Sequence, residues 1–248
     1  MAKTNFLFGL IGKNIAYSFS PKYFKEKFNV LGLTDYDYQN FDLPEIDLLP
    51  KIVKENPNLK GLNVTIPYKE TVIPLLDKIS KKATEIGAVN TIRFTRKNKL
   101  KGYNTDYYGF KKSLKPLLEP HHKKALILGT GGASKAVAFA LKELGILYTF
   151  ASREGSPNNI SYQLINATTF DNHQIIINCT PLGTSPNVDA FPPLPYEFFT
   201  EKHLAYDLIY NPSETIFLKK AKKRGAKIKN GLEMLELQAE KAWRIWNK

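Results

Sequence analysis

A glycine-rich turn between an apolar strand and a helix is the feature that most limits how this chain can fold. Residues 129–134 (GTGGAS) follow the apolar run 125–128 and precede a helical pattern over residues 135–144. A first glycine, Gly129, allows a tight turn, and Gly131 lets the backbone approach a pyrophosphate at the helix N-terminus. This strand–turn–helix context predicts a Rossmann-like dinucleotide site. The expected cofactor residues of this turn are Gly129, Gly131, Gly132 and Ala133.

The residues after the second strand of this unit bear on which dinucleotide is bound. An NAD site usually has an acidic residue there, which binds the ribose 2′-hydroxyl. This chain instead has Ser152 and Arg153 after the strand at 147–152. A guanidinium suits a 2′-phosphate, so the pair predicts NADP, although Glu154 is an unfavourable neighbouring charge. The alternative is that Arg153 is an ordinary surface arginine.

Strand and helix patterns alternate along the whole chain, which predicts an α/β fold of two domains. We expect strands at residues 5–11, 35–41, 59–65, 125–128, 147–152, 175–178 and 204–208, and a hairpin over 89–103. We expect helices at 20–32, 44–55, 69–76, 80–86, 106–118, 135–144, 213–224 and 231–246. In the first helix, Ser20 is the expected N-cap and Pro21 the first helical residue. The predicted domains are a substrate-binding and catalytic domain (residues 1–105 plus 233–248) and a Rossmann-like, doubly wound NADP-binding domain (residues 106–232), with the active site in the cleft between them.

Residues 61–69 (GLNVTIPYK) carry the strongest chemical signal outside the glycine turn. The segment starts as an apolar strand and breaks at Pro67, which has no amide donor for a sheet. It presents the amide of Asn63, the hydroxyl of Thr65 and the ammonium of Lys69. Strand ends that open into loops are where α/β proteins place substrate groups. Two further polar turns, residues 87–91 (GAVNT) and 102–106 (GYNTD), add the amide of Asn90 and the carboxylate of Asp106. Each turn alone is more often structural, but together they form a set able to bind and deprotonate a polyol.

Composition and motif content argue against several other classes of protein. The formal charge is +13, but the lysines are scattered or lie at helical spacing, and no nucleic-acid-binding motif is present. The four histidines show no ligand spacing, so we expect no metal. A single cysteine, Cys179, suits a reducing cytoplasm, and no apolar stretch is long enough to cross a membrane. We therefore expect a cytoplasmic enzyme with a small-molecule substrate and no nucleic-acid or membrane partner, and the oligomeric state, monomer or homodimer, stays open.

The motifs resemble, in order, those of the shikimate dehydrogenase family over nearly the whole chain. Residues 61–69 are similar to the most diagnostic motif of that family, and 87–91 and 104–106 to the next two. Residues 12–21 (GKNIAYSFSP) are similar to its N-terminal loop, with Tyr17 in place of the usual histidine. Residues 178–183 (NCTPLG), 207–212 (DLIYNP) and the segment from Gly231 to Gln238 are similar to its later motifs.

The resemblance implies NADP-linked, reversible reduction of 3-dehydroshikimate to shikimate, a step of aromatic amino-acid biosynthesis. It implies that Lys69 and Asp106 are the catalytic pair and that Ser18 and Ser20 bind the substrate carboxylate. It further implies that Asn63, Thr65, Asn90, Tyr210 and Gln238 line the substrate site, and that Thr180 and Gly231 join the cofactor site.

Three other functions stay open at this point. One is a quinate/shikimate dehydrogenase that accepts NAD, which rates with both substrates and both cofactors would separate. Another is a non-enzymatic metabolite sensor, in which Lys69 and Asp106 form only a structural ion pair. The third is a basic nucleic-acid-binding protein, which a gel shift at physiological salt would detect.

Overall fold

The computed structural model describes residues 5–16 and 18–248; Tyr17, whose place in the N-terminal loop departs from the family pattern, lies outside them. The chain forms two compact units, Met1–Thr105 with Ala239–Lys248, and Asp106–Gln238. The sequence places the second boundary at residue 233, whereas the unit boundary falls at residue 239, inside the C-terminal helix α8 (Leu232–Trp246). The functions expected of the two domains stay predictions.

The first unit is built on a mixed sheet. Within the described residues its strand order is β2-β1-β3-β5-β6-β4. The strands are β1 (Phe6–Gly12), β2 (Tyr36–Asp42), β3 (Leu59–Val64), β4 (Lys78–Ile79), β5 (Thr91–Phe94) and β6 (Leu100–Tyr103). β1 pairs in parallel with both β2 and β3, and β5 pairs antiparallel with β3 and β6. The predicted hairpin is therefore present, and the carboxyl ends of β1 and β3 meet at one edge of the sheet.

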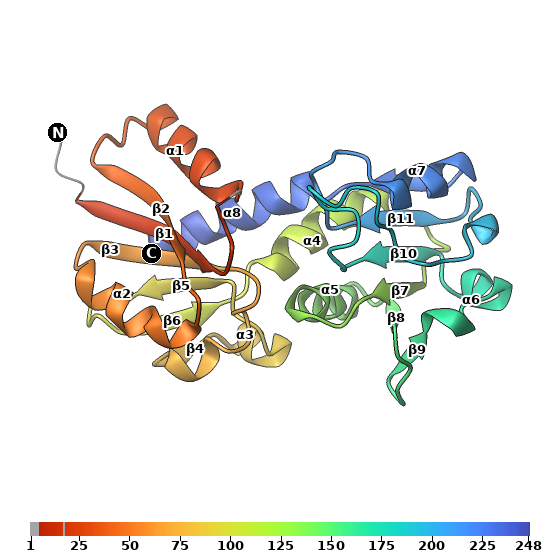
Figure 1. The fold of residues 1–248 in the computed structure, drawn as a ribbon, viewed down its shortest axis with the longest axis horizontal. Coiled ribbons are helices and arrows are strands. Elements are labelled where there is room, and N and C mark those ends of the chain that lie inside the picture. The colour runs from red at the N-terminus through yellow and green to blue at the C-terminus, as the bar shows by residue number, and fades with distance from the viewer. Residues whose placement is uncertain (1–4, 17) are drawn as a thin grey trace. The chain divides into compact units, whose positions relative to one another are not determined.

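Helices cover both faces of this sheet. Helix α1 (Ser20–Val30) and the end of α8 pack on one face through an aromatic cluster that includes Phe24, Phe28 and Trp246. Helices α2 (Leu49–Glu55) and α3 (Lys81–Ile86) accompany the aliphatic cluster on the other face, and Figure 1 shows α1 and α2 on opposite sides of the strands. The helix expected over residues 69–76 is wrong: that segment forms turns and a 3₁₀ helix (Ile73–Leu75). Pro74 within it lacks the amide that a longer helix would use.

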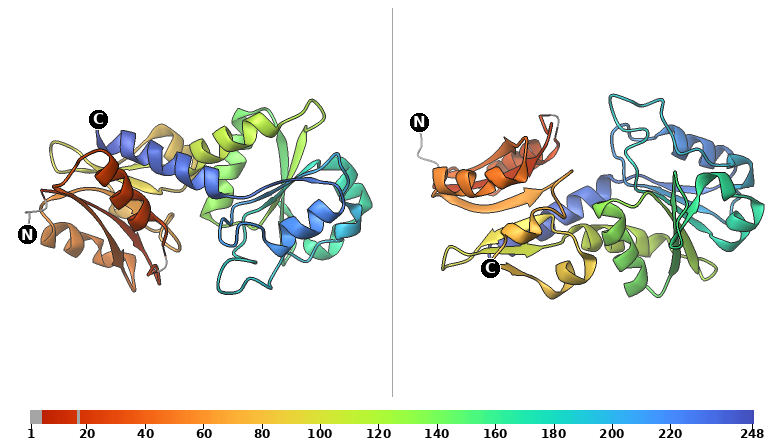
Figure 2. Two further views of the ribbon diagram at one scale, coloured as in Figure 1. Left: turned by 90° about the horizontal axis from the view of Figure 1, so that it is seen from above. Right: turned by 60° about the horizontal axis from the view of Figure 1, so that its bottom comes forward.

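The second unit is a wholly parallel sheet with helices on both faces (Figure 2). Within the described residues its strand order is β12-β11-β10-β7-β8-β9. The strands are β7 (Lys124–Leu128), β8 (Leu147–Ser152), β9 (Asn159–Ser161), β10 (Ile175–Asn178), β11 (Leu204–Asp207) and β12 (Lys227–Lys229). Helices α4 (Asp106–Leu114) and α5 (Gly132–Glu143) pack on one face, and α6 (Ala167–Asn172) and α7 (Ile216–Lys223) on the other. The α/β fold with a Rossmann-like second sheet is confirmed; β4, β9, β12 and α6 were not expected from the sequence.

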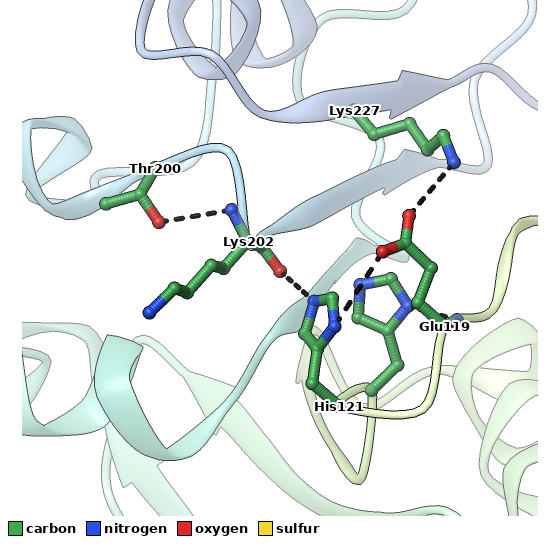
Figure 3. A network of polar contacts seen from close by, with 6 residues as sticks. Glu119, His121, Thr200, Lys202 and Lys227 are labelled. Carbon is green, nitrogen blue, oxygen red and sulfur yellow. Dashed lines mark hydrogen bonds and ion pairs between the residues drawn. The ribbon is translucent and has the colours of Figure 1, made fainter.

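A polar network joins the segment between α4 and β7 to the start of β12 and to the residues that precede β11 (Figure 3). Glu119 accepts from Lys227 Nζ at 3.3 Å, and His121 Nε2 donates to the carbonyl oxygen of Lys202 at 3.0 Å. The backbone amide of Glu119 donates to Nδ1 of the buried His122 at 2.9 Å. Burial, with the neighbouring His121, lowers the pKa of His122 and keeps its ring neutral as an acceptor. The segment that leads into β7 is thereby held at several points.

Candidate active site

The loops after β1 and β3 are brought together by a glycine. Gly12 ends β1, and a Cβ there would lie 2.5 Å from Thr65 Cγ2 and 2.6 Å from Ile15 Cγ2. The absence of a side chain therefore lets the β1 loop lie against Thr65. The Thr65 amide also donates to the carbonyl oxygen of Ile11 at 2.9 Å. The two loops that carry Ser18, Ser20, Thr65 and Lys69 thus leave the same edge of the sheet.

The two serines lie at the start of α1 in roles that differ from the prediction. Helix α1 begins at Ser20, with Phe19 at the N-cap position and no side-chain cap there. Ser20 is therefore the first helical residue, and Pro21 the second. Ser18 Oγ accepts from the backbone amide of Ser20, the first helical residue, at 3.3 Å. Two hydroxyls at a helix N-terminus remain a suitable anion site, since the dipole and the first amides favour negative charge.

A buried amide network joins Asn63 to the two polar turns. Asn63 Nδ2 lies 3.3 Å from the carbonyl oxygen of Asn90 and 3.4 Å from Thr91 Oγ1. Asn90 Oδ1 accepts from the amide of Thr105 at 2.6 Å, and Asn90 Nδ2 donates to Thr105 Oγ1 at 2.9 Å. All four side chains are buried. Because their bonds cross between separate strands, the network fixes the chain up to Thr105, the residue that precedes Asp106.

Lys69 is anchored to the same part of the first unit. Its carbonyl oxygen accepts from the amide of Val89 at 2.7 Å, next to Asn90. Its side chain is half-buried, and β3 has already ended at Val64, before the break that Pro67 predicts. Asp106 is buried and begins α4 in the second unit. The catalytic roles of Lys69 and Asp106 stay predictions.

The glycine turn of the second unit has the geometry that a pyrophosphate needs. Gly129 has a φ of 96°, a conformation that favours glycine, and a Cβ there would lie 3.0 Å from Thr180 Cγ2. Gly131 is the N-cap of α5, and apart from Gly131 itself and its two chain neighbours no atom lies within 4 Å of the position a Cβ would take. The first amides of a helix have no partner within it. Ser134 donates through Oγ to the carbonyl oxygen of Gly131 at 2.7 Å, which closes the turn. The open space at Gly131 lies at the start of α5, where the first backbone amides have no partner within the helix, and it fits a dinucleotide phosphate.

A tight turn presents Arg153 at the end of β8. Asn159 Nδ2 donates to Ser152 Oγ at 2.6 Å, and Ser152 Oγ donates to the carbonyl oxygen of Glu154. Ser161 Oγ donates to the carbonyl oxygen of Arg153 at 3.3 Å. The Arg153 side chain is exposed at the carboxyl edge of the sheet. Ser152 uses its proton inside the turn, so Arg153 is the better candidate for reading a 2′-phosphate.

A second buried network joins two of the motifs named from the sequence, residues 178–183 and 207–212, and supports the neighbouring loops. Asn178 Oδ1 accepts from both the amide (3.0 Å) and the hydroxyl (2.6 Å) of Thr180, and Asn178 Nδ2 donates to Asp207 Oδ1 at 3.1 Å. Asp207 also accepts from Thr215 Oγ1 at 2.6 Å and from the Ile209 amide at 3.0 Å. Burial raises the pKa of Asp207 to about 6, against the lowering effect of these hydrogen bonds. The network orients the Thr180 loop and the loop after β11.

Tyr210, Gly231 and Gln238 lie in the second unit, around α8. The Gly231 amide donates to the carbonyl oxygen of Ile209, and a Cβ on Gly231 would lie 2.0 Å from the carbonyl oxygen of Leu208. Only a glycine lets α8 begin this close to the loop that carries Tyr210. Gln238 packs against α4 at Gly109, where a Cβ would lie 3.1 Å from the backbone amide nitrogen of Gln238. Gly109 lies three residues after Asp106, so Gln238 and Asp106 belong to adjoining helices.

The fold and the site together indicate the class of protein to which this chain belongs. A parallel sheet with a phosphate-type glycine turn, together with a mixed-sheet unit that gathers hydroxyls, amides and a lysine at one edge, is typical of a dinucleotide-dependent oxidoreductase. No cluster of metal-binding side chains occurs in residues 5–16 and 18–248. No helix in the described part of the chain is long and apolar enough to span a membrane.

Comparison with known proteins identifies the family. Residues 10–92 match the shikimate dehydrogenase substrate binding domain. The NADP(+) shikimate dehydrogenase of Caldanaerobacter subterraneus is 39% identical, over 98% of this chain and 92% of the relative. The shikimate dehydrogenase structure from Aquifex aeolicus is 36% identical, with a TM-score of 0.86 over 98% of this chain and 92% of that one. The Thermus thermophilus shikimate 5-dehydrogenase in complex with NADP(H) and shikimate is 35% identical, with a TM-score of 0.85 over 97% and 93%. The chain belongs to the shikimate dehydrogenase family, as its motifs predict.

Proposed function

We propose that this protein catalyses the NADP-linked, reversible interconversion of shikimate and 3-dehydroshikimate. Family membership over nearly the whole chain supports this reaction, as does the complex of the Thermus relative with NADP(H) and shikimate. The observation that carries the proposal is the gathering of Ser18, Ser20, Asn63, Thr65 and Asn90 in the loops and strand ends of the first unit. Such a set matches a substrate with one carboxylate and several hydroxyls.

The proposed substrate contacts follow from what each group can do. Ser18 and Ser20 bind the carboxylate at the start of α1, where the helix dipole and amides add to the attraction. Amides and hydroxyls both donate and accept, so they suit substrate hydroxyls. The residues proposed for the hydroxyls and the wall of the site are Asn63, Thr65, Asn90, Tyr210 and Gln238.

The proposed catalytic residues handle the proton. NADP, when bound, accepts or supplies the hydride at the carbinol carbon. Lys69 takes the hydroxyl proton in the oxidation and returns it in the reduction, and Asp106 orients the ammonium. Asp106 is buried at the start of α4, a setting that holds its side chain in place.

The residues of the second unit fit NADP as the cofactor. The open space at Gly131 and the start of α5 suit the pyrophosphate, and the exposed Arg153 suits the 2′-phosphate. Thr180 and Gly231 complete the proposed cofactor contacts, with Gly129, Gly132, Ala133 and Ser152. A cytoplasmic location and the absence of a nucleic-acid partner stay predictions.

The test is a rate measurement on the purified protein. Shikimate and quinate are each offered with NADP and with NAD, and the reduced cofactor is followed by its absorbance. We expect the highest kcat/KM for shikimate with NADP. Preference for quinate or for NAD would favour the alternative dehydrogenase, and no turnover with any pair would favour a metabolite sensor.

A further inference from the structure

One face of strand β2 holds the loop that carries the two serines. The polar residues Tyr38, Asn40 and Asp42 alternate along β2 and therefore point to the same side. Asp42 accepts from the backbone amides of Asn14 at 2.8 Å and Ile15 at 3.3 Å. Asn40 Nδ2 donates to the carbonyl oxygen of Ile15 at 3.0 Å. The edge strand β2 thus holds the loop between β1 and α1 at Asn14 and Ile15. The sequence predicts this strand only as half-buried.

Tyr38 extends this face into the candidate site. Its side chain is 0% exposed and stacks on Phe24 of α1, with 4.6 Å between ring centroids and 9° between planes. Its hydroxyl donates to Asn63 Oδ1 at 2.9 Å. Burial raises the pKa of Tyr38, so the phenol stays protonated and donates to Asn63.

The directions of these hydrogen bonds follow from the chemistry of each group. The carbonyl oxygen of Asn90 can only accept, so it must face the amide nitrogen of Asn63. The amide oxygen of Asn63 must then face Tyr38, whose single proton it takes. The phenol of Tyr38 thus sets the orientation of the Asn63 amide.

We infer that Tyr38 is a positioning residue for substrate, which holds the Asn63 amide in place through its hydroxyl. The inference rests on the proposed function, because Asn63 is one of the groups proposed to contact shikimate. Tyr38 itself is buried and acts through Asn63. A preset orientation of the Asn63 amide favours substrate binding, since less freedom is lost when the substrate binds.

The test compares two changes of the same kind. Tyr38→Phe removes the hydroxyl and keeps the ring that stacks on Phe24. Tyr206→Phe is the matched control: Tyr206 is also 0% exposed, and its hydroxyl lies 2.7 Å from Ser113 Oγ in the second unit. Loss of one neutral hydrogen bond predicts a shikimate KM about threefold to tenfold higher for Tyr38→Phe, with the NADP KM and kcat nearly unchanged. Tyr206→Phe should leave the shikimate KM at the parental value.

A double-mutant cycle shows whether Tyr38 acts through Asn63. Asn63→Ala should raise the shikimate KM, and adding Tyr38→Phe should raise it by less than the product of the two single effects. A parental KM in Tyr38→Phe, or strictly multiplicative effects, overturns the inference while leaving the proposed function intact. If Tyr38→Phe does not fold, a parental KM in Asn63→Ala overturns it instead. A parent protein that neither oxidises nor binds shikimate overturns both.

Discussion

At the scale of single residues, Lys69 is the centre of the proposed chemistry. It follows the break at Pro67, and its backbone is tied to Val89 beside Asn90. If it transfers the proton, Lys69→Ala should lower kcat about 10²–10⁴-fold and change the shikimate KM much less. Steady-state rates at saturating NADP measure both constants. The family resemblance also implies that Asp106 contacts a substrate hydroxyl, so Asp106→Asn should both lower kcat and raise KM.

Combining the changes at Lys69 and Asp106 provides a control. When two residues act as a unit, the double variant loses less transition-state stabilisation than the sum of the losses in the two single variants. The Lys69→Ala, Asp106→Asn double variant should therefore be only slightly slower than Lys69→Ala. Near-normal kcat with a raised KM in Lys69→Ala would show that Lys69 binds substrate without moving the proton.

Arg153 is the single residue proposed to select NADP over NAD. The turn that involves Ser152, Asn159 and Ser161 presents its exposed guanidinium at the end of β8. A charge-assisted hydrogen bond of about 1.5–3 kcal/mol predicts that Arg153→Ala raises the NADP KM roughly tenfold to a hundredfold. The NAD KM should stay nearly constant, since NAD has no 2′-phosphate. Equal losses with both cofactors would refute this role.

At the scale of elements, Gly109 sets how closely α4 and α8 pack. A Cβ at this position would lie 2.4 Å from the carbonyl oxygen of Met234, which is backbone and cannot move alone. Gly→Ala inside a helix ordinarily stabilises by up to about 1 kcal/mol. Here we expect Gly109→Ala to destabilise by roughly 1–3 kcal/mol, because α8 must shift away from α4. Urea unfolding measures the change, and a stabilised variant would show that the contact relaxes easily.

At the scale of the whole molecule, Asp207 makes stability depend on pH. Burial raises its pKa from 3.8 to about 6, so the folded state holds the proton more tightly than the unfolded state. Its contribution is fully present below a pH of about 4 and is lost as the pH rises through about 6. Two pKa units correspond to about 3 kcal/mol as an order of magnitude.

Asp207→Asn keeps an acceptor at this position and removes the titration. Relative to the parent, the variant should therefore gain stability between about pH 4 and pH 7, by up to roughly 3 kcal/mol. Urea unfolding of both proteins at each pH measures the difference, and other titrating groups cancel in the comparison. A difference in unfolding free energy that does not vary with pH would contradict the expected pKa.

Local signals in the sequence determined much of the fold. The apolar run that becomes β7, the positive φ of Gly129 and the start of α8 after Gly231 all follow from short-range patterns. The order of the polar motifs likewise determined the family. These features depend on residues that are neighbours in the chain, so a linear pattern contains them.

Only the tertiary structure decided the features that join distant residues. The strands β4, β9 and β12 span two or three residues, too few to show a period, and they form because a neighbouring strand offers its edge. The start of α1 at Ser20 depends on Ser18 and on a loop held by Asp42. Tyr38 and Asp207 find partners 25 and 29 residues away, Asn63 and Asn178. Their hydrogen bonds are made in the buried interior, where packing and the need to pair every polar group select the partner.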